Sequence, residues 1–216
     1  MAKIAWRGGA LIAPVPPAMI TCGTMEESNI ITVAWTGILG TVPPKTYISV
    51  RPRRHSYPII KEHGEFVINL ATEDLIHAAD YCGMYTGAKI DKFAACKLTK
   101  EEVPDFSCPM IAESPLSLAC RVTDIVPMGS HDMFIADVVS VHVDESLIDE
   151  NGKLHLDRAK LAAYAHGEYF GLGKKLGFFG FSAVKKKKKK QSAPQKSHSA
   201  KPQSHGKHPH KNKPKA

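Results

Sequence analysis

Residues 29–37 read NIITVAWTG, a short run of β-branched and aromatic residues that ends in a Thr-Gly pair. A run of this kind, bounded by polar and turn-forming residues, is typical of a β-strand that leads into a turn. The same stretch offers backbone amides, two threonine hydroxyls and the ring of Trp35 close together along the chain. It therefore allows two interpretations: an ordinary core strand, or a strand end that holds a planar ligand by apolar contact and backbone donors.

Similar runs follow along the chain and predict a mainly β fold, a β-rich member of the α+β class. The clearest is residues 115–125, in which apolar and polar residues alternate. Short strands separated by turn signals point to a barrel or a sandwich. The expected strands are residues 18–24, 30–35, 46–51, 66–70, 115–125 and 134–143.

Short helices are expected at three places between and after these strands. Residues 56–63 begin with a serine that can cap a helix and carry Pro58 in the first turn, where proline is tolerated. Residues 72–81 begin with Thr-Glu-Asp, a capping threonine followed by acids that suit the positive end of a helix. Residues 157–165 are the third candidate, before the glycine-rich residues 167–180.

The distribution of charge divides the chain into two parts. The formal net charge is +8, but 12 lysines and no acids lie from Lys185 onward. Residues 1–184 therefore hold 17 Lys and Arg against 21 Asp and Glu, a net charge near −4. We expect residues 1–184 to fold as one domain and residues 185–216 to form a disordered basic tail. Binding to nucleic acid or to an anionic surface is expected only through this tail.

Cysteine usage and hydropathy predict a cytoplasmic protein without a metal site. The five cysteines are scattered and contain no CxxC pair, so they predict neither a disulfide scaffold nor a zinc site. The histidines of residues 198–210 lie in the expected tail and do not predict an ordered metal site. No stretch approaches the roughly 20 apolar residues of a membrane span. Prolines interrupt the apolar run near the N-terminus, so neither a secretory signal nor membrane association is expected.

Residues 47–57, YISVRPRRHSY, gather three arginines and two serines around an expected strand end and helix start. A phosphate monoester carries up to about two negative charges, and guanidinium groups, hydroxyls and a helix N-terminus are suited to hold it. The simpler alternative is a solvated basic turn. The position of Ser56 at the expected helix start favours the phosphate site.

Residues 80–93, DYCGMYTGAKIDKF, form a third segment with the character of a binding loop. Lys92 can place a point charge on a phosphate, and Gly87 lets the backbone approach a ligand closely. The alternative is a loop lysine that pairs with Asp91 or another acid.

In residue identity and in order along the chain, these three segments resemble those of the FMN-binding split-barrel flavin reductases, the flavoredoxin-like group. The most specific match runs from Thr86 to Phe93, which is similar to the family pattern S/T-G-x-x-x-D-K-F. The resemblance covers residues 10–182. It implies a split β-barrel with short flanking helices, built as a homodimer with FMN near the subunit interface. Barrel closure agrees with the many short strands, because it removes exposed sheet edges.

The resemblance also assigns FMN contacts to individual residues. It implies that Arg51, Ser56 and Lys92 hold the phosphate, while Arg53 and Arg54 are expected to face water. The residues implied as FMN contacts are Asn29, Thr32, Val33, Ala34, Trp35, Ser49, Val50, Arg51, Ser56, Thr86, Gly87 and Lys92.

His131, in a Gly-Ser-His-Asp turn, is the catalytic candidate that the resemblance implies. In the family, a histidine at this place lies near the nicotinamide or substrate side of the flavin, where it can orient the donor or supply a proton. A plain strand-end histidine is the alternative. Tyr169 and Phe170 are similar to the family's closing motif, which implies that they cover the flavin or contact a second subunit; ordinary packing is the alternative.

The implied function is that of an NAD(P)H-dependent oxidoreductase, which moves hydride through FMN to a flavin, ferric, quinone or protein acceptor. The glycines of residues 171–177 do not form GxGxxG and lack βαβ surroundings, so a Rossmann site is not expected. Two alternatives stay open. One is a non-catalytic FMN electron carrier fed by another reductase, and the other is a nucleic-acid or anionic-surface binder that works through the tail.

Overall fold

The computed structural model describes residues 1–183, so the tail expected at residues 185–216 lies outside the described residues. The chain divides into two compact units, residues 1–175 and residues 176–216. The described part of the second unit contains one 3-10 helix, Phe181–Ala183. The first unit contains the sheets, the longer helices and the candidate site.

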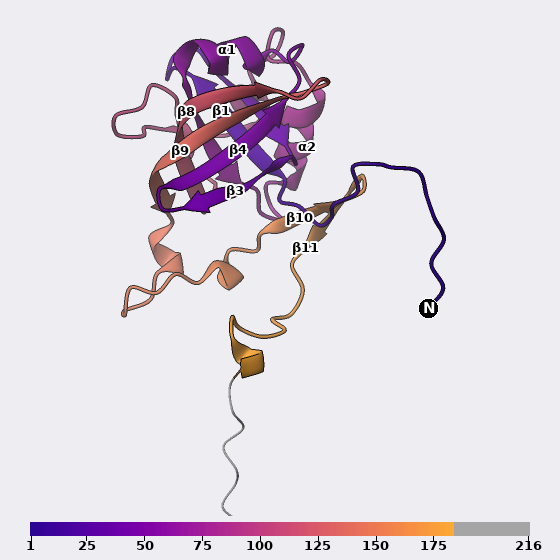
Figure 1. Cartoon of the computed structure of the whole chain (residues 1–216). Helices are drawn as coiled ribbons and strands as arrows, with labels where there is room; N and C mark the ends of the chain where they lie inside the picture. The colour runs from indigo at the N-terminus through magenta and orange to yellow at the C-terminus, as the bar shows by residue number, and fades with distance from the viewer. Residues whose placement is uncertain (184–216) are drawn as a thin grey trace, which may run out of the picture. The chain divides into compact units, whose positions relative to one another are not determined.

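A seven-stranded antiparallel sheet forms the body of the first unit (Figure 1). Its strands lie in the order β2-β1-β5-β8-β9-β4-β3. Their bounds are Ala18–Gly23 for β1, Ser28–Val33 for β2, Thr36–Thr41 for β3, Pro44–Val50 for β4, Glu65–Leu70 for β5, Leu116–Pro127 for β8 and Asp132–Val143 for β9.

The order of the strands requires the sheet to close on itself. β2 and β3 lie at its two opposite edges, yet only Ala34 and Trp35 separate them along the chain. Three Cα–Cα steps span at most about 11 Å. The two edges must therefore meet at this link, which rolls the sheet into a split barrel.

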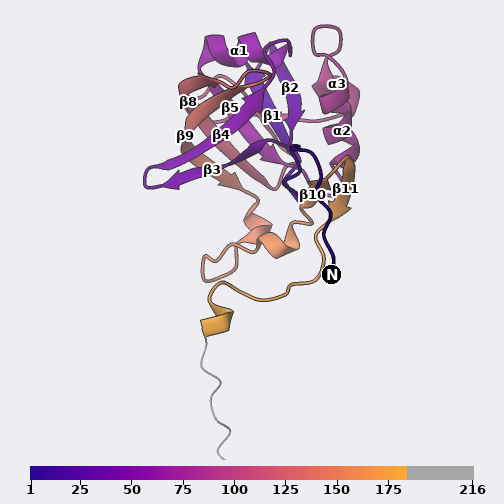
Figure 2. The same ribbon diagram turned by 45° about the vertical axis from the view of Figure 1, so that its right-hand side comes forward.

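Short elements flank the barrel. Figure 2 shows α2 and α3 beside each other, next to the hairpin of β10 and β11. Within residues 1–183, no helix has both the length and the apolar character that crossing a membrane requires. The bounds are Ser56–His63 for α1, Ile76–Met84 for α2, Lys92–Cys96 for α3, Lys100–Glu101 for β6, Met110–Ile111 for β7, Ala162–Ala165 for β10 and Glu168–Gly171 for β11, with 3-10 helices at Glu145–Leu147 and Leu156–Arg158.

The expected strands are all present, with ends that shift by at most two residues. The first expected helix is α1, with the predicted bounds, although its serine is buried and does not cap it. The second starts at Ile76 instead of residue 72, because Thr72 pairs with Leu161 in an isolated bridge. Residues 157–165 do not form the expected helix: Tyr164 pairs with Val15, and the stretch becomes a 3-10 turn followed by β10.

Two apolar clusters pack the barrel and its flanking helices together. Inside the barrel, Phe66 and Phe134 are fully buried, and α1 covers one end (Figure 1). Tyr57 of α1 meets Phe134 edge-on, with ring centroids 5.2 Å apart. Outside the barrel, Met19 of β1 and Ala79 of α2 belong to a second cluster that seats α2 on the sheet.

A buried asparagine joins several strands by polar contacts. Asn69 of β5 is fully buried, and its Nδ2 donates to the carbonyl of Met19 at 2.9 Å. Its Oδ1 accepts from the backbone N–H of Ile111 at 2.9 Å and from Ser117 Oγ at 2.8 Å. One amide thereby satisfies polar groups of β1, β7 and β8, which would otherwise be buried without a partner.

We expect Asn69→Ala to lower the free energy of unfolding by about 2–4 kcal/mol, because it leaves the buried Ile111 N–H and its neighbours unpaired. Urea denaturation of the full chain measures this. Asn151→Ala, at an exposed turn, is the matched control and should change the value by less than about 0.5 kcal/mol. Equal small effects in both variants would contradict the role given to Asn69.

Candidate functional site

Two adjoining cavities open where the link between β2 and β3 passes the end of β4. The larger has a volume of about 550 Å3 and the smaller about 220 Å3. Ile31 and Arg54 line both of them. The site is therefore built where the barrel closes.

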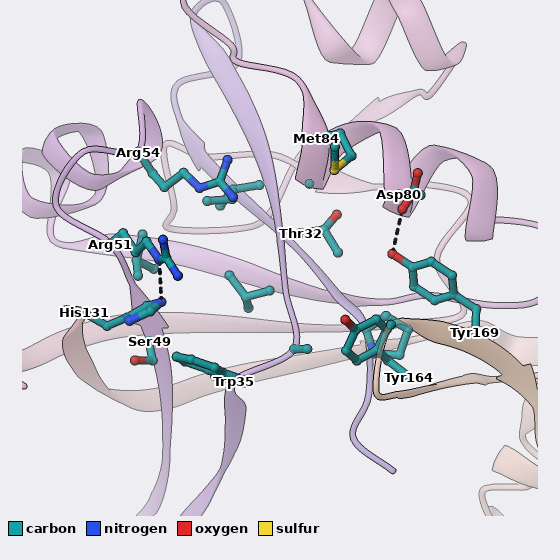
Figure 3. A pocket seen from close by; sticks show the side chains of 17 residues that line it. Thr32, Trp35, Ser49, Arg51, Arg54, Asp80, Met84, His131, Tyr164 and Tyr169 are labelled. Carbon is teal, nitrogen blue, oxygen red and sulfur yellow. Dashed lines mark hydrogen bonds between the residues drawn. The ribbon is translucent and has the colours of Figure 1, made fainter. Parts of the chain in front are cut away.

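One wall of the larger cavity is the hairpin of β10 and β11, which lies against α2 (Figure 3). The hairpin turns at His166 and Gly167, both with positive φ (51° and 95°). The hydroxyl of Tyr169 donates to Asp80 Oδ1 of α2 at 3.0 Å and ties the hairpin in place. Burial, reinforced by Asp80, raises the pKa of Tyr169 to about 12, so the phenol keeps its proton at neutral pH.

The opposite side of the larger cavity is a corner in which two cations, Arg51 and Arg54, lie near His131 (Figure 3). Arg51 Nε donates to His131 Nε2 at 3.2 Å, and His131 Nδ1 lies 2.9 Å from Ser130 Oγ. Because Nε2 accepts a hydrogen bond, the ring proton belongs on Nδ1 and points to Ser130. The His131 ring also lies beside that of Trp35, with centroids 4.4 Å apart.

This corner keeps His131 uncharged. Burial, followed by the positive charges of Arg51 and Arg54, lowers the pKa of the imidazole below its usual range. The Nε2 atom is also occupied by Arg51. In this structure, His131 therefore orients Arg51 and has no proton to offer from that nitrogen.

The smaller cavity lies between the start of α1 and the loop before α3. Asn29 Nδ2 donates to Ser56 Oγ at 2.7 Å, and both residues are buried. A Cβ on Gly87 would stand 2.0 Å from Asn29 Oδ1, so only glycine fits at this position. Thr86 and Arg53 also line this cavity.

Lys92 is a buried cation at the floor of the smaller cavity. Its Nζ donates to the carbonyl of Ile30 at 2.6 Å and to that of Cys82 at 2.8 Å. Burial is the main cause that lowers its pKa, and the charge of Arg54 acts in the same direction. An ammonium group has three N–H donors. Two of them tie β2 to α2, and the third has no acceptor among residues 1–183.

The structure divides the predicted binding residues between the two cavities. Thr32, Val33, Ala34, Trp35, Ser49, Val50, Arg51 and His131 line the larger cavity, and Asn29, Ser56, Thr86, Gly87 and Lys92 line the smaller one. Arg51 does not line the cavity that contains Ser56 and Lys92. Arg53 and Arg54 were expected to face water, but they line that smaller cavity.

Several lining residues were not assigned individually from the sequence. Asp80 and Met84 of α2 lie within the predicted segment of residues 80–93, whereas Tyr164 comes from β10. Tyr164 lies in the stretch expected to be helical, so nothing in the sequence indicated that it lines the cavity. For Arg54, the signal was its place two residues before Ser56, at the start of α1.

Comparison with known proteins identifies the family. Residues 12–173 match the model of the flavin reductase like domain. The chain belongs to this family. An uncharacterized protein of Archaeoglobus fulgidus is 30% identical over 128 residues, which are 59% of this chain and 72% of that protein. An NADPH-flavin oxidoreductase of Streptomyces viridifaciens is 24% identical over 69% of this chain and 78% of its own.

Solved structures confirm the fold. The flavoredoxin of Desulfovibrio vulgaris (Miyazaki F) superimposes with a TM-score of 0.79 and 26% identity, over 85% of this chain and 100% of that chain. The predictions of a mainly β split barrel, of the flavin reductase family and of the flavin cofactor, FMN, are confirmed.

The residues present fit FMN. The smaller cavity contains cations, hydroxyls and no carboxylate, which suits a phosphate. The larger cavity joins an indole ring, aliphatic side chains and threonine and serine hydroxyls, which suits a planar ring with a polar edge. The absence of a side chain at Gly87 leaves room for the Asn29 amide in the smaller cavity.

We expect the His131 imidazole to titrate below its ordinary pKa of 6.5 and Arg51→Met to raise that pKa part of the way back. Removing the positive neighbour favours the protonated ring, while burial, the larger cause, remains. NMR titration of the imidazole Cε1 proton, assigned with His131→Gln, measures this. Arg51→Lys keeps the charge and should leave the pKa low. An unchanged pKa in Arg51→Met would contradict the coupling.

Proposed function

We propose that this protein is an FMN-dependent reductase that takes electrons from NADH or NADPH. The observation that supports this most is the pair of adjoining cavities: a ring-sized one with an aromatic and hydroxyl lining, and a small cationic one without acids. Separate cavities of these two kinds suit the two chemical parts of FMN.

In this proposal, the phosphate lies in the smaller cavity and is held by Arg54, Ser56 and Lys92. These residues line it together, whereas Arg51 lines the larger cavity. Lys92 is already fixed by two carbonyls, and Ser56 by Asn29, so both are in position before the ligand arrives. Such preorganisation lowers the entropy lost on binding.

The ring lies in the larger cavity, against the residues that close the barrel. Its proposed contacts there are Thr32, Val33, Ala34, Trp35, Ser49 and Val50. Asn29, Thr86 and Gly87 are proposed to contact FMN from the smaller cavity. Trp35, Met84 and Tyr164 cover it from water. The chemistry that a bound FMN would supply is acceptance of a hydride from NADH or NADPH and release of two electrons to a flavin, ferric, quinone or protein acceptor.

We further propose that the protein is a homodimer and is cytoplasmic. Ile38 of β3 and Val139 and Val141 of β9 are exposed apolar side chains, which supports a covered face in a dimer. Free cysteines support a reducing compartment. Residues 1–184 are proposed to be the catalytic domain, and residues 185–216 to be a basic appendage that adds attraction to anionic partners.

We expect Arg54→Gln to weaken FMN binding about tenfold to a hundredfold, because a charge-assisted hydrogen bond to the phosphate is lost. Quenching of flavin fluorescence during titration of the apoprotein measures the dissociation constant. Arg7→Gln, in the exposed N-terminal segment, is the matched control and should leave binding unchanged. Wild-type affinity in Arg54→Gln would contradict the phosphate assignment.

The reductase proposal predicts that FMN-loaded protein loses its yellow absorbance when NADH or NADPH is added without oxygen. The spectrum is recorded for each nucleotide, with dithionite as the reference for complete reduction. If the protein binds FMN and dithionite bleaches it but neither nucleotide does, the reductase proposal fails and the protein is an electron carrier. Failure to bind FMN would reject both functions.

A further inference from the structure

We propose that Arg51 recognises a phosphate of the pyridine dinucleotide that reduces this protein, at a subsite separate from the one that holds the FMN phosphate. The inference rests on the proposed function, because it assigns the residue that binds the anionic part of the electron donor. It follows from where the cations of the site lie and from what each already contacts.

The site carries more positive charge than one phosphate monoester requires. Arg53, Arg54 and Lys92 line the smaller cavity, and a monoester carries up to about two negative charges. Arg51 adds a further guanidinium group, and it lines only the larger cavity. Among the described residues, no carboxylate lies within 4.0 Å of any of these arginines.

The acids near this corner are already engaged elsewhere. Asp132 follows His131 along the chain, but its Oδ2 accepts from the hydroxyl of Tyr57 at 2.6 Å. Asp80 lines the same cavity on the opposite side, where Tyr169 donates to it (Figure 3). A ligand that covers Arg51 must therefore bring its own negative charge, or a cation is desolvated without a partner.

Arg51 is oriented in advance for an anion. Its Nε–H is used by His131, which is itself held by Ser130 and lies against Trp35. The two terminal amino groups of the guanidinium have no acceptor among residues 1–183. These are the donors that grip a phosphate in a bidentate manner, and an arginine fixed by its Nε loses less side-chain freedom on binding.

The position of Arg51 indicates which ligand it serves. The ring of the cofactor and the nicotinamide that reduces it must share the larger cavity, since hydride transfer requires contact. NADH and NADPH carry a diphosphate, and NADPH carries an additional 2′-phosphate. Arg51 lines this cavity and not the one that contains Ser56 and Lys92. Its guanidinium is therefore placed for a phosphate of the donor and not for the phosphate of the cofactor.

The test compares charged and neutral donors in the reductive half-reaction of FMN-loaded protein, without any acceptor. Stopped-flow absorbance follows flavin reduction by NADH, by NADPH and by the neutral donor 1-benzyl-1,4-dihydronicotinamide. We expect Arg51→Gln to raise the half-saturating concentration of the dinucleotides about tenfold to a hundredfold. We expect a change of less than about twofold for the neutral donor, since it has no phosphate to lose. An effect on both dinucleotides assigns the diphosphate, and an effect on NADPH alone assigns the 2′-phosphate.

Two binding measurements complete the test without turnover. Arg51→Gln should keep the FMN dissociation constant within about threefold of wild type. In the same variant, the dissociation constant of NAD⁺ or NADP⁺, measured from the change in the flavin spectrum, should rise by the same factor as the half-saturating concentration of the reduced dinucleotide. Arg51→Lys keeps the charge but not the paired N–H donors of a guanidinium, so it should recover part of the lost dinucleotide affinity.

The outcomes separate this inference from the proposed function. Equal losses for charged and neutral donors, or a large loss of FMN affinity in Arg51→Gln, would overturn the inference and leave the reductase proposal standing. Unchanged dinucleotide binding in Arg51→Gln would also overturn the inference without affecting the reductase proposal. Protein that binds no FMN, or that no nicotinamide donor reduces, would overturn both.

Discussion

The two-residue link between β2 and β3 is the constraint on which the rest of this structure depends. It joins strands at opposite edges of a seven-stranded sheet, so the sheet has to close. Ala34 and Trp35 form that link and also line the larger cavity. Closure of the barrel and construction of the site are therefore one event, and the ends of β2 and β4 face each other only in the folded protein.

Lys92 connects the stability of this region to its electrostatics. A buried ammonium group is costly unless its donors are satisfied, and here two backbone carbonyls, from Ile30 and Cys82, satisfy it. The same two bonds hold α2 against β2. A positive charge is thus kept at the floor of the smaller cavity by contacts that also shape the cavity, and no acid neutralises it there.

The site is cationic although the first 184 residues carry a net negative charge near −4. The arginines around the two cavities have no acid partner in the described part of the chain, while Asp80 and Asp132 are bound by tyrosine hydroxyls. Local positive potential in a negative protein concentrates anionic ligands at one place. His131 fits this arrangement because its low pKa keeps the ring neutral, so that it can accept from Arg51.

The sequence by itself determined the strands and the position of α1, because alternation and helix-start patterns depend on neighbours along the chain. It also singled out the three segments that line the two cavities, although the serine expected to cap α1 is buried instead. It did not determine the secondary structure of residues 157–165, where pairing of Tyr164 with Val15 overrides the local preference for a helix. Nor could it determine which cavity each arginine faces. Arg51 and Arg54 are three residues apart, and their directions depend on the turn after β4 and on His131, 80 residues away. Only the tertiary structure decided this, because a side chain's partner is fixed by contacts between distant strands.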